Sequence, residues 1–279
     1  MRRYPGFTKE NTMSIRTVPA SNGVTWITEG VALILKNPGP FVLMGLVMAV
    51  VGIIPILGSL ALAIIGPALY GGIAWAAREQ ARGGTAQFDH LGQAFREEGK
   101  VGPMLLLCLP GIVCGVIAGI VIVIFAAIAL AGAGVSAATE SPAALFASLG
   151  IGGLLVFVVV MAVALVAFAL TFFAIPDVMF ARNDAFAAMK ESVRACLANV
   201  GAALLYLLVL VLAFFIATFV LSLVSAILAQ LLVMIVVAPV AAASMYLAWK
   251  DVYGETTAEL PAVPPQPPEP PQDGGGIAA

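Results

Sequence analysis

Uncharged apolar stretches alternate with short charged segments along most of this chain. Runs without a single charge cover residues 40–77, 101–139 and 195–249. A helix needs about 20 consecutive apolar residues to span the hydrocarbon layer of a membrane, so the first run is long enough for two helices. The pattern predicts six membrane-spanning helices, at residues 40–56, 60–78, 103–130, 150–177, 201–226 and 230–249.

Residues with special backbone preferences mark the breaks between these helices. Pro55 and Gly58, in the segment IPILGS, favour a tight turn. Gln230 marks the predicted turn between the last two helices. Residues 132–150 are expected to form a loop, in which Ser141 caps a short surface helix that begins at Pro142.

The composition also indicates a membrane protein. Of the 279 residues, 62% are hydrophobic and 10% are charged, whereas a soluble domain is about half apolar and a quarter charged. A soluble core could not bury this much apolar surface, so part of the solvent must be lipid. The first 24 residues contain no apolar segment, so we expect no cleavable signal peptide. No strongly basic region indicates nucleic acid as a partner.

The basic residues predict the orientation in the membrane. All 13 Lys and Arg residues fall in the N-terminal arm, in two of the loops that connect the helices, or directly after the last helix, which six spans place on one side. Because basic loops stay in the cytoplasm, we expect a multi-pass protein of the inner (cytoplasmic) membrane with both termini in the cytoplasm.

Three amphipathic segments precede spans at the charged side, and each predicts a helix that lies in the membrane interface. The histidine-containing segment, residues 88–98, places Phe88, Leu91 and Phe95 on one stripe. Residues 25–37 place Ile27, Val31, Ile34 and Leu35 on one face, and residues 185–199 do the same with Phe186, Met189, Val193 and Leu197.

Similar corners and prolines follow each amphipathic segment. The corners read KNPGPF at 36–41, GKVGPM at 99–104 and ANVGAA at 198–203. The second helix after each corner carries a proline: Pro67, Pro176 or Pro239. The sequence therefore predicts an all-α, polytopic fold of three parallel repeats, each an amphipathic helix plus a hairpin. The prolines are candidates for helix kinks or for the lining of a cavity.

Few residues could carry chemistry. His90, with Asp89, Glu97 and Glu98, could be a general base, but the helical periodicity favours a polar residue on a wet face. Asp177 could couple to protons, although its place at a helix end favours contact with water and Arg182. No charge lies near the predicted midplane of any span, which argues against ion-coupled transport. The three cysteines lack metal-type or disulfide-framework spacing.

Two further features indicate contacts rather than catalysis. Gly111, Gly115 and Gly119 recur at every fourth residue, a stripe typical of close helix packing, either within the chain or with another subunit. Residues 251–279 are rich in proline and predict a disordered cytoplasmic tail. The predicted division is therefore a cytoplasmic arm at 1–24, a six-helix transmembrane domain at 25–250 and the tail.

Several segments carry a resemblance to known proteins. VPASNGVTW (18–26), IPILGSLALAIIGPALYGG (54–72) and AIPDVMFARNDAFAAMKESVRACLANVGA (174–202) resemble a bacterial family of six-span inner-membrane proteins of unknown function. They are more distantly similar to the membrane domain of some glycerophosphodiester phosphodiesterases. The resemblance implies no activity and no site residues for this chain, since the phosphodiesterase catalytic domain has no counterpart here.

Two hypotheses for function follow. The first is a protein without enzymatic activity or cofactor, with a structural or interaction role in the envelope as a homo-oligomer or with a protein partner. The second is a carrier or binder of lipid or another apolar small molecule, held between the proline-bearing helices. Both make the lipid bilayer the principal partner.

Overall fold

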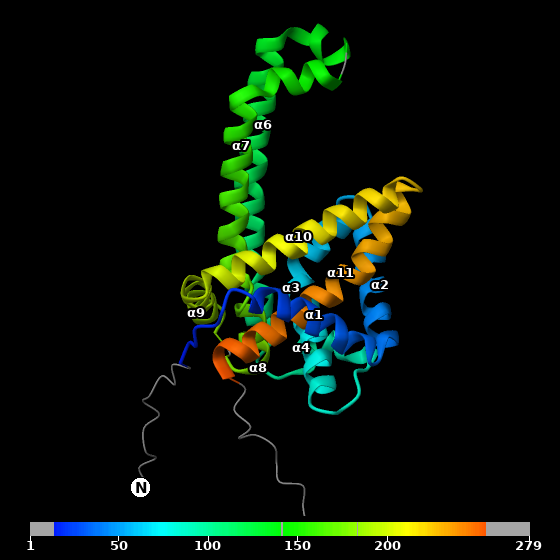
Figure 1. The fold of residues 1–279 in the computed structure, drawn as a ribbon, viewed down its shortest axis with the longest axis vertical. Coiled ribbons are helices and arrows are strands. Elements are labelled where there is room, and N and C mark those ends of the chain that lie inside the picture. Colours follow the sequence, from blue (N-terminus) through cyan, green and yellow to red (C-terminus); the bar gives the residue numbers. More distant parts are fainter. Residues whose placement is uncertain (1–13, 141, 183, 255–279) are drawn as a thin grey trace, which may run out of the picture.

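The computed structural model describes residues 14–140, 142–182 and 184–254, and within them it contains helices and short links but no strand (Figure 1). The all-α prediction is therefore confirmed. The elements are α1 Asn22–Leu35, α2 Pro38–Ile53, α3 Leu57–Ala81, the 3₁₀-helix η1 Phe88–Gly92, α4 Gln93–Arg96, α5 Val101–Leu106, α6 Cys108–Glu140, α7 Pro142–Thr171, α8 Ala174–Phe180, α9 Ala185–Ala198, α10 Val200–Ser222, α11 Ala226–Trp249 and the π-helix η2 Lys250–Gly254.

The long helices make this a multi-pass membrane protein. Five segments of the described chain are long and apolar enough to cross a membrane, at Leu57–Ala81, Val101–Ala129, Gly152–Phe180, Val200–Ser222 and Leu231–Gly254. Helix α2 has 16 residues and is thus about 24 Å long. It meets α1 at a bend of 109°, and the two helices together are long and apolar enough to form a sixth candidate span.

Turn positions agree with the sequence at one hairpin and differ at two others. The α2–α3 turn falls at 54–56, as predicted, and a side chain at Gly58 would collide with the carbonyl oxygen of Val51. The α10–α11 turn instead lies at 223–225, so Gln230 is inside α11; with neither glycine nor proline near this turn, the sequence gives no strong marker of its position. Ser141 lies outside the described residues.

The prediction of a loop at 132–150 was also wrong, because α6 continues to Glu140. This stretch is rich in alanine, the strongest helix former. The helix predicted to begin at Pro142 is present as the start of α7. It is separated from the rest of α7 by a break at Gly150, whose φ of 39° is outside the helical range and is tolerated by glycine.

The amphipathic segments form helices, and only part of each predicted apolar face is turned toward the protein. In α1 the buried residues are Gly23, Trp26, Gly30 and Leu33, whereas Leu35 is 69% exposed. In α9 the small residues face inward and Leu197 is 71% exposed. In η1 and α4, Leu91 is buried while Phe88 and Phe95 are exposed. Small residues permit close helix contact, while Leu35, Phe95 and Leu197 point outward.

The three repeats pack in a cycle, because each amphipathic helix lies against the hairpin of the preceding repeat. The pair η1–α4 contacts α3, α9 contacts α7 and α8, and α1 contacts α10 and α11. A side chain at each corner also donates a hydrogen bond to the backbone shortly before the next amphipathic helix: Asn37 Nδ2 to the Ala86 carbonyl (3.1 Å), Lys100 Nζ to the Arg182 carbonyl (3.1 Å), and Asn199 Nδ2 to the Arg16 carbonyl (3.0 Å). The repeat prediction is confirmed in sequence order and in contacts.

The second helices of the three repeats meet at the centre of the charged end. Helices α3, α8 and α11 contact one another, and the ring of Phe180 lies 6.1 Å from Trp75, 5.7 Å from Tyr246 and 5.3 Å from Trp249 between centroids. The guanidinium carbon of Arg78 is 4.7 Å from the Phe180 ring centroid. An aromatic cluster therefore fills this end of the space between the proline-bearing helices.

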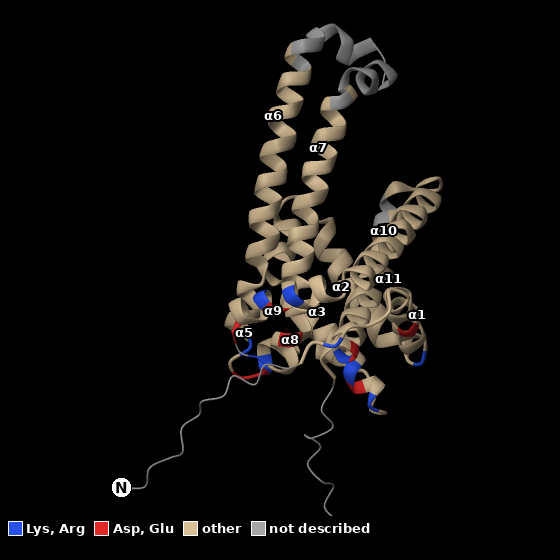
Figure 2. Ribbon diagram, turned by 60° about the vertical axis from the view of Figure 1, so that its left-hand side comes forward, with Lys and Arg blue, Asp and Glu red and all other residues tan. Residues whose placement is uncertain are grey.

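The Lys and Arg residues of the described chain gather at one end of the molecule (Figure 2). The described parts of α6, α7, α10 and α11 that extend away from this end carry no Lys or Arg near their far ends. This arrangement matches the predicted one-sided distribution of Lys and Arg, and the cytoplasmic location of that side stays a prediction. The end of the predicted arm contacts the start of the predicted tail, since Arg16 N donates to the Val252 carbonyl at 2.9 Å. Residues 1–13 and 255–279 lie outside the description.

The α6–α7 hairpin extends away from the other two hairpins (Figure 1). Its helices contact each other along their length. The glycine stripe faces open space, since a Cβ atom at Gly111, Gly115 or Gly119 would meet no atom within 4 Å. The stripe therefore makes no close helix contact within the described chain, and its role in contact with another subunit stays a prediction.

Candidate functional site: an apolar groove beneath α9

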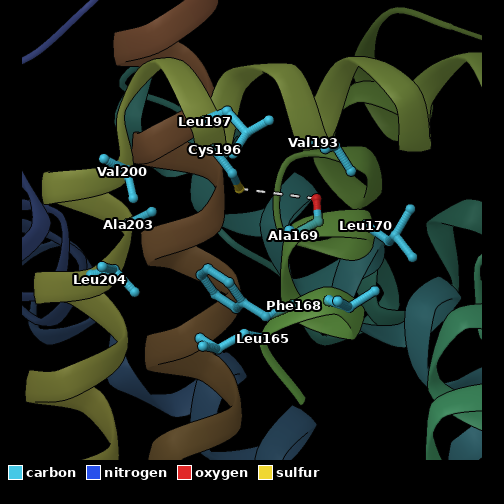
Figure 3. Close-up of a pocket in the computed structure, with 11 residues that line it drawn as sticks. Leu165, Phe168, Ala169, Leu170, Val193, Cys196, Leu197, Val200, Ala203 and Leu204 are labelled. Atoms are coloured by element: carbon cyan, nitrogen blue, oxygen red, sulfur yellow. Dashed lines mark hydrogen bonds between the residues drawn. The ribbon is translucent and has the colours of Figure 1, made fainter. Parts of the chain in front are cut away.

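An apolar groove of about 480 Å³ lies between α7 and α10, directly beneath α9 (Figure 3). Its lining is apolar apart from the backbone and one thiol. The residues come from three helices: Leu165, Val166, Phe168, Ala169 and Leu170 of α7, Val193, Cys196 and Leu197 of α9, and Val200, Ala203 and Leu204 of α10. All three belong to the end of the spans next to the charged side, so the groove starts at the interface and continues into the apolar layer.

Small residues create the space. Ala169 and Ala203 line the groove, and neither side chain reaches far enough to bridge α7 and α10. Val200 and Leu204 follow the α9–α10 corner on the same face and are 53% and 49% exposed. The groove is thus open at the side of the molecule.

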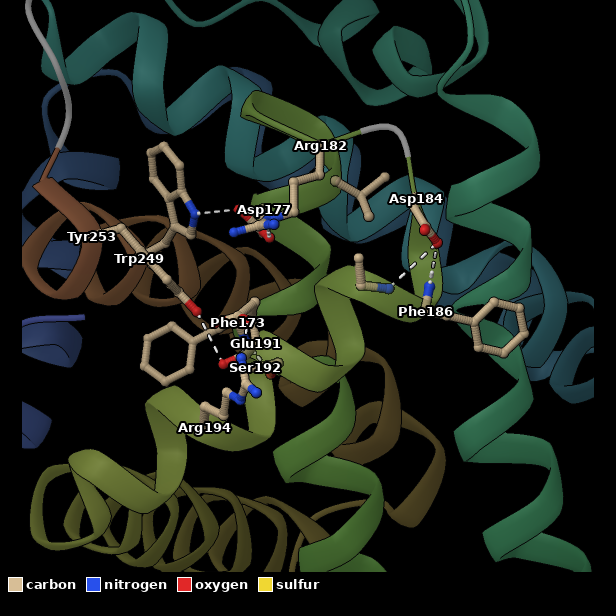
Figure 4. Close-up of polar contacts among 12 residues, drawn as sticks. Phe173, Asp177, Arg182, Asp184, Phe186, Glu191, Ser192, Arg194, Trp249 and Tyr253 are labelled. Carbon is tan, nitrogen blue, oxygen red and sulfur yellow. Dashed lines mark hydrogen bonds and ion pairs between the residues drawn. The ribbon is translucent and has the colours of Figure 1, made fainter. Parts of the chain in front are cut away.

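A break between α7 and α8 shapes the upper wall (Figure 4). In an unbroken helix the Phe173 N–H would donate to the Ala169 carbonyl, four residues earlier. Here Ser192 Oγ lies between them: it accepts from Phe173 N at 3.1 Å and donates to the Ala169 oxygen at 2.7 Å. Pro176 follows as the third residue of α8 and has no N–H of its own to donate. An inserted side chain and a proline are both recognised causes of helix breaks.

Cys196 is the one reactive side-chain type on the groove wall. Its Sγ lies 3.9 Å from the Ala169 carbonyl oxygen (Figure 3). Burial raises the pKa of the Cys196 thiol to about 12. The nucleophilic form of cysteine is the thiolate, so at neutral pH this thiol serves as an apolar wall group. The groove can bind an apolar molecule, but its own side chains supply no acid, base or nucleophile.

Behind the groove, a buried ion pair holds the end of α8 (Figure 4). Asp177 is 1% exposed, and its Oδ2 lies 2.7 Å from Arg182 Nε. Trp249 Nε1 donates to Asp177 Oδ1 at 3.4 Å. The predicted proximity to Arg182 is thus confirmed, but the expected contact of Asp177 with water was wrong, since α11 covers it. The pair joins α8 to α11 and does not line the groove.

Lys100 stabilises the same region from the second corner. Its ammonium donates to the carbonyls of Val178 and Arg182, at 2.7 and 3.1 Å, where the exposed carbonyls of a helix C-terminus favour a cation. Burial lowers the pKa of Lys100, while the carboxylates of Glu97 and Asp177 oppose that shift. Sequence inspection did not single out this contact, because it joins residues almost 80 positions apart.

Polar residues on the inner side of α9 attach it to the domain (Figure 4). Glu191 Oε1 accepts from Arg194 Nη1 at 2.6 Å, and the Glu191 carbonyl accepts from the Tyr253 hydroxyl at 3.2 Å. At its N-terminus, Asp184 accepts from the amides of Phe186 and Ala187. The Tyr253 contact therefore joins α9 to the rest of the domain, whereas Asp184 and the Glu191–Arg194 pair stabilise the helix itself.

The histidine segment is located elsewhere, on η1 and α4 against α3. His90 Nδ1 accepts from the Gln87 amide at 3.3 Å, which caps the short helix. Asp89 pairs with Arg96 at the surface at 2.8 Å, and this hydrogen bond lowers the pKa of Asp89. His90 thus caps the start of the short helix. Its described hydrogen bond is to a backbone amide and not to a carboxylate that would orient the ring.

The remaining predicted site residues are not brought to the groove. Pro67, Pro176 and Pro239 are not among its lining residues. They also do not line a second cavity, of about 310 Å³, whose walls include Arg16, Glu29 and Asp251. Among the described residues, no three His, Cys, Asp or Glu side chains are grouped so as to hold a metal ion.

The groove-forming residues were missed because they look ordinary in sequence. Alanine and leucine recur throughout the spans, and Ser192 stands in a polar segment where it reads as a surface residue. One signal was available: the corner ANVGAA has alanine where KNPGPF and GKVGPM have phenylalanine and methionine.

Comparison with protein-family models, with curated proteins and with solved structures gave no match.

Proposed function

We propose that this membrane protein binds a lipid, or another apolar molecule of similar shape, in the groove beneath α9. The observation that carries the proposal is the groove itself: about 480 Å³ of apolar space at the polar end of the spans, open toward the bilayer. Ligand sites of several hundred Å³ with apolar walls suit small molecules and acyl chains. The binding is non-covalent, with no enzymatic step and no cofactor.

The test is to fill the groove and measure the lipid that remains with the protein. Val200→Trp and Leu204→Trp each add a large ring at the groove, from positions already half exposed. Leu212→Trp is the matched control, because Leu212 is on the same helix, is equally exposed and does not line the groove.

Lipid extracted from each purified variant is quantified by mass spectrometry per mole of protein. We expect the unmodified protein and Leu212→Trp to retain one lipid per chain, and the groove variants to lose most of it. Equal lipid in all four proteins would refute binding in the groove.

The proposal includes a location. The Lys and Arg residues all fall on one side of the predicted spans, which supports cytoplasmic termini in the inner membrane. We also propose that the chain belongs to a bacterial family of six-span inner-membrane proteins. A cysteine introduced by Ser141→Cys should react with a membrane-impermeant thiol reagent in intact cells, while Cys196 should not. Reaction of the introduced cysteine only after the membrane is permeabilised would reverse the orientation.

A structural or interaction role in the envelope is the second candidate, and the α6–α7 hairpin favours it. Large apolar residues such as Val123, Ile128, Leu154 and Phe157 are exposed on it, and a Cβ atom at Gly115 would meet no atom of the described residues within 4 Å. If another subunit covers this face, Gly115→Leu should shift the detergent-extracted protein from a larger to a smaller species in size-exclusion chromatography. An unchanged elution volume would count against this role for the stripe.

A further inference from the structure

The exposed stripe of α9 combines apolar groove residues with a positive charge. Phe186, Lys190, Val193 and Leu197 follow one another at intervals of three or four residues, so they lie on one helix face. Val193 and Leu197 line the groove, and Lys190 is exposed one turn before them. Phe186 and Leu197 are exposed apolar residues at either end of the stripe, as in a helix that lies in the membrane interface.

The acidic residues of α9 are turned away from this stripe or engaged elsewhere. The Glu191 side chain is 11% exposed and is held by Arg194 at 2.6 Å. Asp184 caps the N-terminus of the helix through the amides of Phe186 and Ala187. The Arg194 side chain itself is 53% exposed. The charge that α9 presents to the interface beside the groove is therefore positive.

From this arrangement we propose that the ligand is an anionic phospholipid, with one acyl chain in the groove and its phosphate-bearing headgroup beside Lys190. The inference rests on the proposed lipid-binding function and adds the headgroup class. A lysine side chain beside apolar residues extends its ammonium toward the headgroup layer. Each basic residue near the surface adds attraction for anionic lipid. A chain that fills the groove places its headgroup at α9, because the groove opens directly beneath this helix (Figure 3).

The experiment compares two lipids with identical chains. Full-length protein, purified in non-ionic detergent and stripped of lipid, is titrated with dioleoyl phosphatidylglycerol or with dioleoyl phosphatidylcholine, and bound lipid is counted by native mass spectrometry. We expect the anionic lipid to bind about fivefold more tightly, the factor typical of one interfacial lysine. Lys190→Gln should remove this preference and leave phosphatidylcholine binding unchanged, while Lys190→Arg should retain it.

Lys36→Gln is the matched control, because Lys36 is also an exposed lysine at the end of an amphipathic helix and does not line the groove. It should keep the fivefold preference. A preference that survives Lys190→Gln, or that is lost equally with Lys36→Gln, overturns the headgroup assignment.

The groove variant Leu204→Trp separates this failure from failure of the proposed function. If Leu204→Trp weakens binding of both lipids but Lys190→Gln changes nothing, the groove binds lipid without selecting the headgroup by Lys190. If Leu204→Trp alters neither lipid, the proposed lipid-binding function itself fails.

Discussion

Two equivalent interfaces between repeats differ in how they are closed. Where α11 meets α2, the helices touch: a Cβ atom at Gly45 would collide with the backbone of Ile235, and Phe41 and Met44 are fully buried in a core shared with Ala242 of α11. Helix α7 is likewise the second helix of one repeat, and it faces α10, the first helix of the next repeat. Here the two helices leave the 480 Å³ groove between them. The cyclic order makes these two places counterparts.

The fourth residue after each corner accounts for much of the difference. After Asn37 it is Phe41, and after Lys100 it is Met104; both are fully buried, and Met104 Cε lies against Gly71 of α3. After Asn199 it is Ala203, which lines the groove. A repeat architecture can thus obtain one binding site by shortening one side chain at a position that is filled in the other repeats.

The largest expected effect concerns the exclusion of water from the groove between α7 and α10. The pKa of Cys196 is raised from 9.0 to about 12, so at pH 8 its thiolate fraction should be roughly a thousandfold lower than that of an unperturbed thiol. In a Cys108→Ser, Cys114→Ser protein, the alkylation rate with N-ethylmaleimide should therefore be very low at pH 8 and rise about tenfold per pH unit up to pH 11. A rate that levels off near pH 9 would show a wet groove.

At the closed interface, the strongest destabilisation should come from removing its large side chain. Phe41→Ala leaves a cavity in a fully buried site and should lower the free energy of unfolding by about 4 kcal/mol, measured by denaturation in detergent. Phe215→Ala on α10, where the ring is mostly exposed, should cost less than about 1 kcal/mol. Equal losses would mean that the closed interface gains nothing from Phe41.

An intermediate effect is expected at the helix break that forms the groove wall. Ser192→Ala removes the hydroxyl that bonds both Phe173 N and the Ala169 carbonyl. This leaves Phe173 N unpaired and the Ala169 carbonyl with only the weak Cys196 thiol donor, which should cost about 2 kcal/mol. The control is Ser222→Ala, whose exposed hydroxyl bonds only the Phe219 carbonyl. If both changes cost the same, the α7–α8 break is maintained without Ser192.

The smallest effect on stability, and the sharpest test of the comparison, is expected from Ala203→Met. This change gives the third repeat the residue found at Met104 in the second. Ala203 is 4% exposed and lines the groove, so the added side chain should enter the groove at an overpacking cost of about 1 kcal/mol, while retained lipid falls. Ala127→Met, at an exposed site on α6, should leave both quantities unchanged. Loss of folding with Ala203→Met would show that the space is not available to a side chain.

Much of the architecture could be predicted from sequence, because membrane spans depend on local composition. A run of about 20 apolar residues has few alternatives to a helix in lipid, where unpaired backbone groups are costly. The α2–α3 turn, the helix start at Pro142 and the repeated corners follow from glycine, proline and charge positions that are visible in the chain. Asn37, Lys100 and Asn199 mark equivalent corners by sequence alone.

The site depended on contacts that no local pattern contains. The sequence determined which residues are apolar, but in α1 and α9 it did not determine which apolar face turns inward, since both lipid and protein accept such residues. Gly111, Gly115 and Gly119 have the spacing of a contact stripe, yet Gly23, Gly45 and Gly72 make the close contacts. Tertiary structure decided that Ala203 and Ala169 face each other across a gap and that Ser192 enters the α7–α8 break. The physical reason is that a groove is a property of the distance between helices, which is set by side chains far apart in the sequence.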